Sequence, residues 1–374
     1  MKHIAQLLLL LPLLWAVGCQ KESSRQEREM TGTKGEAPVQ IHASLATSTP
    51  ATKSIIRGTD IPDQFSYGLF VCTEGNTDEA HKMNSWNLKS SYAAGLEGEA
   101  GTWSFQYIDD YGSGELSANT YDYITITSKE DENGNSIKAD LYAYAPYIKG
   151  TFSPTAIPFS IAKNNYNQID LMYAEENDLP AINKGLDPLA NVEKLEANFT
   201  FKHALALLVF EFEIKNHNNA FSTKYLLNNI TIKKINPENN TEAHLYKSGY
   251  FNAITPTFYN CSEVDALSVS ITNDLGDNFA IIPVEGGPDA TAYVALVPTK
   301  VEDDELEIVI TLNSHPTKPF VIKKENLRHN GGEFGFQGGY KYTFSFTMDN
   351  YLYLDDFSIS EWDDQEYPLE TVEI

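Results

Sequence analysis

Cysteine is scarce in this chain, with three among 374 residues. Cys72 and Cys261 stand far apart, and no Cys or His cluster has the spacing of metal ligands. Neither a disulfide framework nor a structural metal site is therefore expected. We interpret these two cysteines as small apolar side chains buried in different domains. The third, Cys19, directly follows an apolar N-terminal run.

Positive charge is also scarce, since 27 Lys and Arg against 52 Asp and Glu give a formal net charge of −25. Such a surface repels polyanions, which argues against nucleic acid or an anionic membrane surface as a partner. It favours a soluble, self-repelling surface, or assembly through backbone pairing. Calcium is a weaker candidate, because the stretch 131–135 misses the EF-hand spacing and lacks the closing Glu.

Motifs for catalysis are missing from the sequence. There is no Gly-x-Ser-x-Gly, no His-Glu-x-x-His and no Gly-rich phosphate loop. Acidic pairs such as Asp355-Asp356 and Asp363-Asp364 are too common here to indicate a catalytic dyad. His203 lies in an apolar stretch, which favours a core or strand-end histidine over a ligand. We expect a protein that is not an enzyme and that uses no cofactor or metal.

The N-terminus has the pattern of a signal peptide. Lys2 and His3 precede the apolar run Leu7–Val17, which is too short to span a bilayer as a helix and ends before Gly18-Cys19. A Cys directly after Gly resembles the lipobox of bacterial lipoproteins, in which that Cys carries the lipid. We therefore predict a lipoprotein signal peptide over residues 1–18 and lipidation of Cys19. The alternative is an ordinary secretory signal with an incidental Cys.

Residues 20–38 are polar and without apolar period, which predicts a flexible tether. Beyond them, β signals recur at short intervals and no long amphipathic helix pattern is present. Asn133-Gly134 between alternating runs predicts a hairpin turn. Strands are predicted at 39–45, 65–72, 102–108, 121–127, 136–147, 169–174, 199–214, 225–235, 268–272, 278–282, 292–297, 305–312, 340–348, 351–354 and 357–362.

The segment Phe199–Ile214 is the most apolar of these strands. Its apolar residues alternate at first, run unbroken over Ala204–Phe210, and then alternate in the other phase. This predicts one strand that is buried on both faces or bulged where the phase switches, opening a second domain. The spacing of strands and turns predicts an all-β fold of two antiparallel β-sandwiches in series, at 58–192 and 193–374.

Several aromatic residues of the first half could stack on sugars. Because alternation puts several of them on core faces, packing is the favoured interpretation. The residues in question are Trp86, Tyr92, Trp103, Tyr107, Tyr121 and Tyr123.

Short motifs spread along the chain resemble the fimbrillin family of Bacteroidales, which comprises subunits of type V pili and related Mfa-like lipoproteins. The motifs follow the family's order and cover almost the whole chain. They are the lipobox at Cys19, the basic loop Lys53–Arg57, and the segments Phe65–Val71, Asp170–Ala174, Phe201–Ala206, Gly339–Phe344 and Ile359–Trp362.

The resemblance implies two tandem transthyretin-like β-sandwich domains and a defined maturation. Residues 19–57 would form the tether plus a removable first strand, Val39–Leu45. A protease would cut after Arg57, with Lys53 as second choice, and a neighbouring subunit's C-terminal strand would fill the vacated groove. The donor-strand region lies near 351–374, where the resemblance points to Tyr351, Tyr353, Phe357, Ile359 and Trp362.

The implied partners are other pilus subunits, a maturation protease, the outer membrane through the lipid, and a host protein or glycan. The implied location is the cell surface, first as an outer-membrane lipoprotein and then in the pilus. Two alternatives stay open. One is a monomeric surface glycan-binding lipoprotein, and the other is a tip or anchor adhesin that does not polymerise.

Overall fold

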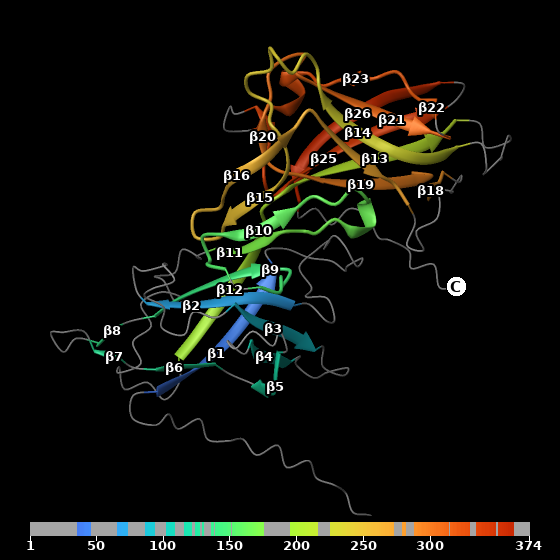
Figure 1. Ribbon diagram of the computed structural model, residues 1–374. Coiled ribbons are helices and arrows are strands. Elements are labelled where there is room, and N and C mark those ends of the chain that lie inside the picture. The colour runs from blue at the N-terminus through green and yellow to red at the C-terminus, as the bar shows by residue number, and fades with distance from the viewer. Residues whose placement is uncertain are drawn as a thin grey trace, which may run out of the picture.

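Most of the residues that the computed structural model describes lie in strands, which are arranged in two lobes (Figure 1). Among the described residues there is no α-helix, and therefore none that could cross a membrane; the two short 3₁₀ turns are Asn165–Asn167 and Lys324–Leu327. The prediction of an all-β fold is confirmed. The described residues are 36–45, 66–73, 87–93, 102–108, 116–121, 124–127, 129–130, 136–137, 139–150, 152–175, 195–215, 225–272, 279–281, 288–313, 315–329, 334–348 and 351–362.

The N-terminal lobe is one nine-stranded sheet with the order β5-β4-β3-β2-β9-β11-β12-β1-β6. Its strands alternate aromatic or β-branched residues with polar ones, the composition that suits a half-buried pleated surface. They are β1 (Glu36–Leu45), β2 (Ser66–Thr73), β3 (Leu88–Ala93), β4 (Thr102–Ile108), β5 (Leu116–Tyr121), β6 (Ile124–Thr127), β9 (Ala139–Ala145), β11 (Met172–Glu175) and β12 (Leu195–His203).

The C-terminal lobe contains two larger sheets. One has the order β19-β13-β25-β26, and the other is six-stranded with the path β17-β14-β21-β22, to which β18 and β23 add at β14 and β21. The strands are β13 (Ala206–Ile214), β14 (Leu226–Lys234), β17 (Ala266–Ser270), β18 (Phe279–Ala280), β19 (Ala290–Leu296), β21 (Leu306–Leu312), β22 (His315–Pro316), β23 (Phe320–Val321), β25 (Tyr340–Met348) and β26 (Leu352–Glu361).

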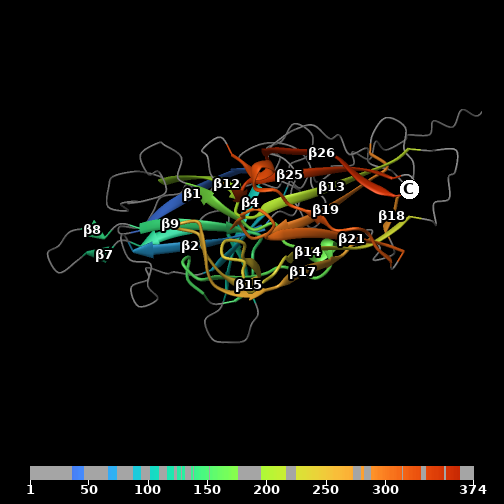
Figure 2. The same cartoon turned by 90° about the horizontal axis from the view of Figure 1, so that it is seen from above.

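Three small sheets complete the molecule. They are β10-β15-β16, β20-β24 and β7-β8. Seen from above, β1, β2, β9 and β12 lie toward one end of an elongated molecule and β14, β19 and β21 toward the other (Figure 2). The strands are β7 (Lys129–Glu130), β8 (Ser136–Ile137), β10 (Ile157–Ser160), β15 (Leu245–Asn252), β16 (Thr257–Val264), β20 (Thr299–Lys300) and β24 (Gly335–Phe336).

The core of the C-terminal lobe is aromatic on the side of the four-stranded sheet. The ring of Phe210 stacks on that of Phe344, with centroids 5.3 Å apart, and Phe212 stacks on Phe346 at 5.6 Å. Phe320, on the six-stranded sheet, meets Phe346 edge-on at 4.9 Å. These contacts join the two sheets face to face, which is the packing of a β-sandwich.

The prediction of one strand over Phe199–Ile214 was wrong, because the chain changes sheets within it. β12 ends at His203 in the nine-stranded sheet, and β13 begins at Ala206 in the four-stranded one. The backbone between them is anchored on both sides: Ala204 donates to the carbonyl of Leu171 at 2.8 Å, and Leu205 accepts from Gly339 at 2.9 Å. The phase switch therefore marks a passage between lobes. The domain boundary at 192/193 stays a prediction.

Other departures from the prediction have local causes. Of the stretch predicted at 121–127, Tyr121 is the last residue of β5 and residues 124–127 are β6. The stretch predicted at 136–147 is two strands, β8 and β9, and the two stretches after 350 are one strand, β26. β3, most of β5, β10, β15 and β16 were not predicted. Polar residues and Tyr interrupt the apolar period of β3, β5, β15 and β16, and β10 is a four-residue strand that contains Pro158. β7 pairs with β8 across the expected hairpin, whose turn residues lie outside the described residues.

The cysteines differ in part from the expectation. Cys72 lies on β2 and Cys261 on β16, in different sheets. Cys261 is a free thiol that is only half-buried, and this burial raises its pKa. The side chain of Cys72 and the whole of Cys19 lie outside the described residues.

Candidate assembly site

The first strand, β1, lies inside the nine-stranded sheet and is paired on both sides. It runs parallel to β12, in register from Val39 opposite Leu195 to Leu45 opposite Phe201. Its other edge pairs antiparallel with β6, from Glu36 opposite Thr127 to Val39 opposite Ile124. Removing β1 would leave the edge of β12 without its neighbour, and an unpaired edge is a template for another strand.

β12 packs against β2 and pairs with β11 in addition to its pairing with β1. Phe199 and Phe201 are each 1% exposed, and both meet the ring of Tyr67 on β2, at centroid distances of 6.1 and 5.3 Å. On its far edge β12 pairs with β11, from Met172 opposite His203 to Glu175 opposite Thr200. The acceptor edge therefore has its own support.

The C-terminal strand, β26, is the edge strand of the four-stranded sheet. It pairs antiparallel with β25 from Tyr340 opposite Glu361 to Met348 opposite Leu352, with a register shift between Ser345 and Phe346. The shift makes Asp355 the extra residue of a β-bulge. Asp355 and Asp356 are both exposed on this edge, so they form no enclosed dyad.

The bulge decides which side chains of β26 face the core. Leu352, Leu354, Phe357 and Ile359 lie opposite the inward residues of β25, whereas Tyr353 lies opposite Thr347 on the other face. Phe357 contacts Phe344 with ring centroids 4.8 Å apart. The predicted donor residues thus do not share one face, and the two leucines were missed because a strict period of two does not continue through a bulge.

The predicted donor residues also differ in exposure. Tyr351 and Tyr353 are 73% and 49% exposed, Phe357 and Ile359 are half-buried, and Trp362 is 4% exposed. Trp362 follows β26 and donates its backbone N–H to the carbonyl of Gly339 at 2.8 Å. Its indole stacks on His203. The end of the C-terminal strand is therefore fixed to the junction between the lobes.

His203 has the strand-end role that its sequence context indicates. It is the last residue of β12, and its Nδ1 lies 2.9 Å from Oδ1 of the buried Asp170. The stretch Asp170–Ala174 leads into β11, so this contact ties the ends of two neighbouring strands together. Among the described residues no group of three or more His, Cys, Asp or Glu could hold a metal ion.

The two lobes share one local pattern of strand directions. β12 is antiparallel to β11 and parallel to β1, which is in turn antiparallel to the edge strand β6. β13 is antiparallel to β19 and parallel to β25, which is antiparallel to the edge strand β26. The remaining pairs of strands among the described residues are antiparallel. The N-terminal strand thus occupies, in its lobe, the position that β25 occupies in the other.

The predicted processing residues Lys53 and Arg57 lie outside the described residues, in the connection between Leu45 of β1 and Ser66 of β2. The described residues do not test whether the aromatic residues of the first half pack in the core, as favoured, or could stack on sugars. Trp86 and Tyr123 lie outside the described residues, and Tyr92, Trp103, Tyr107 and Tyr121 lie on β3, β4 and β5 without described side chains.

These features define an all-β protein in which the N-terminal strand lies inside one sheet and the C-terminal strand at the edge of another. A family model described as fimbrillin-like matches residues 117–362, and the chain belongs to this family. It is a family of fimbrial and cell adhesion proteins. The resemblance read from the sequence is thereby confirmed. No curated protein matches the sequence.

Solved structures of fimbrial and adhesion proteins are also similar in part. A protein from Bacteroides ovatus assigned to cell adhesion is 16% identical, with 87% of this chain and 97% of that chain covered and a TM-score of 0.49. A fimbrial protein from Bacteroides vulgatus is 12% identical, with coverages of 87% and 99% and a TM-score of 0.42. The tip fimbrial protein Mfa3 from Porphyromonas gingivalis is 10% identical, with coverages of 87% and 100% and a TM-score of 0.36.

Proposed function

We propose that this chain is a pilus subunit that is secreted as a lipoprotein, matured by proteolysis and polymerised by donor-strand exchange. In this proposal Cys19 carries the lipid, and a protease cuts after Arg57 or, as second choice, Lys53. The C-terminal region 351–374 of one subunit then fills the groove vacated by β1 in the next. The protein acts in adhesion at the cell surface, is not an enzyme and needs no cofactor.

The observation that carries the proposal is the place of β1 in the sheet. Both proposed cutting sites fall between β1 and β2, so either cut separates β1, and no other described strand, from the rest of the chain. After the cut, β1 is held only by its pairing with β12 and β6 and by packing. A strand of similar length from another subunit can restore the same backbone hydrogen bonds.

The C-terminal strand β26 has features of a donor strand, but it must leave its own sheet before it can be donated. Its outer edge pairs with no strand among the described residues. Leu352, Phe357 and Ile359, which pack against the core, and Leu354, which is 37% exposed on the same face, have the apolar character that a groove requires. To be donated, it must first leave β25, which uncovers Tyr342 and Phe344. Head-to-tail transfer does not close on itself and therefore yields a filament.

A tip or anchor subunit is the second candidate, and one observation favours it: β26 is docked on its own sheet and fixed at Trp362. A subunit whose C-terminal strand stays docked accepts a strand without giving one. A third candidate, a monomeric glycan-binding lipoprotein, keeps both β1 and its lipid.

The test is the intact mass and N-terminal sequence of the protein released from the cell surface, with electrophoresis in mild detergent. We expect an N-terminus at Gly58, or at Ser54 if the second site is used, together with a ladder of oligomers. Arg57→Gln should move the cut to Lys53 or abolish it. Arg328→Gln, an exposed arginine in the C-terminal lobe, is the matched control.

Two results would separate the candidates. A processed N-terminus without oligomers would favour the tip or anchor role. A single monomeric species that still begins at lipidated Cys19 would contradict both maturation and polymerisation, and would leave the anchored or glycan-binding lipoprotein.

A further inference from the structure

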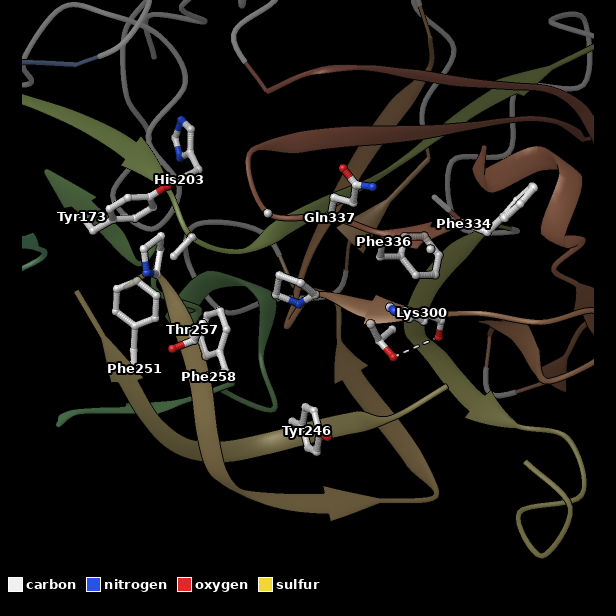
Figure 3. Close-up of a pocket in the computed structure, with 16 residues that line it drawn as sticks. Tyr173, His203, Tyr246, Phe251, Thr257, Phe258, Lys300, Phe334, Phe336 and Gln337 are labelled. Atoms are coloured by element: carbon white, nitrogen blue, oxygen red, sulfur yellow. Dashed lines mark hydrogen bonds between the residues drawn. The ribbon is translucent and has the colours of Figure 1, made fainter. Parts of the chain in front are cut away.

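A pocket of about 530 Å³ lies where the two lobes meet the small sheet β10-β15-β16, and we call it the junction pocket (Figure 3). Its lining comes from β11, β12, β15, β16, β20 and β24. Its volume is in the range of pockets that bind small molecules. No residue of β1 or β26 lines it, although His203 at the end of β12 does. The proposed strand exchange therefore does not fill this pocket.

Aromatic rings form two opposite walls of the junction pocket. Figure 3 shows Tyr173, Phe251 and Phe258 on one side, and Phe334 and Phe336 on the other. Phe251 and Phe258 support one another at a centroid distance of 5.0 Å, and Phe251 meets Tyr173 at 5.8 Å. Because a sugar ring has apolar C–H faces and polar edges, two aromatic walls suit a saccharide unit between them.

The wall that carries Phe334 and Phe336 is held from behind by hydrogen bonds. The hydroxyl of Tyr342 donates to the carbonyl of Gly335 at 3.0 Å and accepts the backbone N–H of Gln337 at 2.6 Å. Nε2 of the buried His329 lies 2.8 Å from the same hydroxyl. The pocket is therefore preformed rather than dependent on a loop closing over the ligand.

Polar groups that face no protein partner lie in the same pocket. Among the described residues, neither the hydroxyls of Tyr173 and Tyr246 nor the ammonium group of Lys300 makes a hydrogen bond or ion pair to the protein. Burial raises the pKa of both tyrosines, so their hydroxyls stay protonated and able to donate at neutral pH. These three groups are available to a ligand.

The charge of the pocket is opposite to that of the chain. The protein has 52 acidic residues, yet no Asp or Glu is among the residues that line this pocket, whereas Lys300 is. A ligand carboxylate at Lys300 would meet a cation and no lining anion, whereas Glu263, outside the lining, acts electrostatically on Tyr246. We propose that the junction pocket binds an acidic monosaccharide unit, such as a sialic or uronic acid at the end of a glycan, with the carboxylate on Lys300 and the ring between the aromatic walls.

The test is calorimetric titration of the purified full chain with the methyl glycosides of N-acetylneuraminic acid and glucuronic acid, and with methyl glucoside as the neutral partner. We expect an acidic sugar to bind at least roughly tenfold more tightly than the neutral one. Lys300→Ala should remove this preference, and Tyr173→Phe should weaken binding of every sugar that binds the parent. Lys318→Ala, an exposed lysine outside the pocket, should change nothing.

Thermal unfolding of each variant shows that it is folded before it is titrated. A peptide that matches residues Glu370–Ile374 supplies a carboxylate without a sugar ring. Binding of that peptide but of no sugar would overturn the proposal, as would failure of every sugar to bind, or an acidic preference that survives Lys300→Ala. Because none of these titrations requires polymerisation, the two proposals fail independently.

Discussion

The imidazole of His203 lies flat against the indole of Trp362, with ring centroids 4.0 Å apart and planes 6° from parallel. His203 ends β12, the strand that would accept a donor, and Trp362 follows β26, the strand that would be donated. One stacking contact therefore joins the two strands on which the proposed assembly depends. The indole N–H of Trp362 is buried without a hydrogen-bond partner. Stacking and burial, rather than a side-chain hydrogen bond, therefore attach Trp362 to His203.

Trp362→Ala should loosen the C-terminal strand. Removing a buried Trp side chain costs about 3–5 kcal/mol, and here the loss falls on the end of an edge strand. We expect faster hydrogen exchange in β26 than in β25, and a lower midpoint of urea unfolding. Tyr351→Ala is the control, because that side chain is 73% exposed and its loss should cost no more than about 0.5 kcal/mol. Unchanged exchange in β26 would show that the stack does not hold the strand.

Deleting single residues from β26 tests the bulge. Without Asp355, only Asp356 separates Leu354 from Phe357, which is the regular spacing of two residues on one face of a strand. Both side chains therefore stay on the face that they share with Phe346 and Phe344 of β25. We expect this deletion to cost about 1 kcal/mol or less, because only the irregular residue is lost. Deleting Ser358 instead turns Ile359 outward, which should lower stability by about 2 kcal/mol or more. Equal unfolding midpoints for the two deletions would contradict the assigned register.

The lowered pKa of the Glu305 carboxyl makes the stability of the fold depend on pH. Burial by itself raises the pKa of its carboxyl, but backbone N–H groups at 3.0–3.3 Å donate to the carboxylate and together hold the pKa below its ordinary value. The donors are Glu302, Thr241, Glu242 and Ala243. A lowered folded pKa gives stability that is complete above the unfolded pKa and is lost as the pH falls through the folded pKa.

Glu305→Gln should therefore lower the free energy of unfolding by about 1.5–3 kcal/mol at neutral pH, and the difference should shrink as the pH falls through the folded pKa of this carboxyl. Urea unfolding at a series of pH values measures both effects. Glu307→Gln is the matched control: its partner Lys233 is 42% exposed, and such surface pairs contribute about 0–1 kcal/mol. A gap between Glu305→Gln and the parent that stays constant down to acid pH would refute the role of the carboxylate.

Loss of β1 should turn the monomer into an associating species. A chain without residues 36–45 leaves the edge of β12 unpaired, and we expect dimers or larger oligomers in analytical ultracentrifugation. A synthetic peptide of Glu36–Leu45 added in trans should return the protein to a monomer, because it can restore the pairing with β12 and β6. A peptide of the same composition in scrambled order is the control. A shortened chain that stays monomeric without the peptide would contradict the role of the groove.

Much of the fold could be predicted from local patterns. The strand at 340–348 was bounded correctly, because its inward residues Tyr342, Phe344, Phe346 and Met348 alternate without interruption. The strand at 102–108 was also bounded correctly, because Trp103, Phe105 and Tyr107 alternate with polar residues in the sequence. β15 and β16 escaped prediction because most of their residues are partly or fully exposed, so burial imposes little pattern on their sequence.

The strands that form the proposed assembly site were predicted from the sequence, but the way they pair with other strands was not. The first strand and the C-terminal strand could be located from alternation, and the fimbrillin resemblance supplied their roles. That β1 pairs parallel to β12 depends on residues about 155 positions apart in the chain, for example Val39 and Leu195. The junction pocket was not foreseen for a similar reason, since Tyr173, Lys300 and Phe334 come from three distant segments.

By itself the sequence determined that this protein is all-β, strongly acidic and built from alternating short strands, because period and composition are local properties. Only the tertiary structure decided that the segment Phe199–Ile214 serves two sheets, that a bulge at Asp355 sets the inward face of the last strand, and that His203 meets Trp362. Each of these depends on which distant backbone supplies the hydrogen-bond partner, and a local pattern does not contain that information.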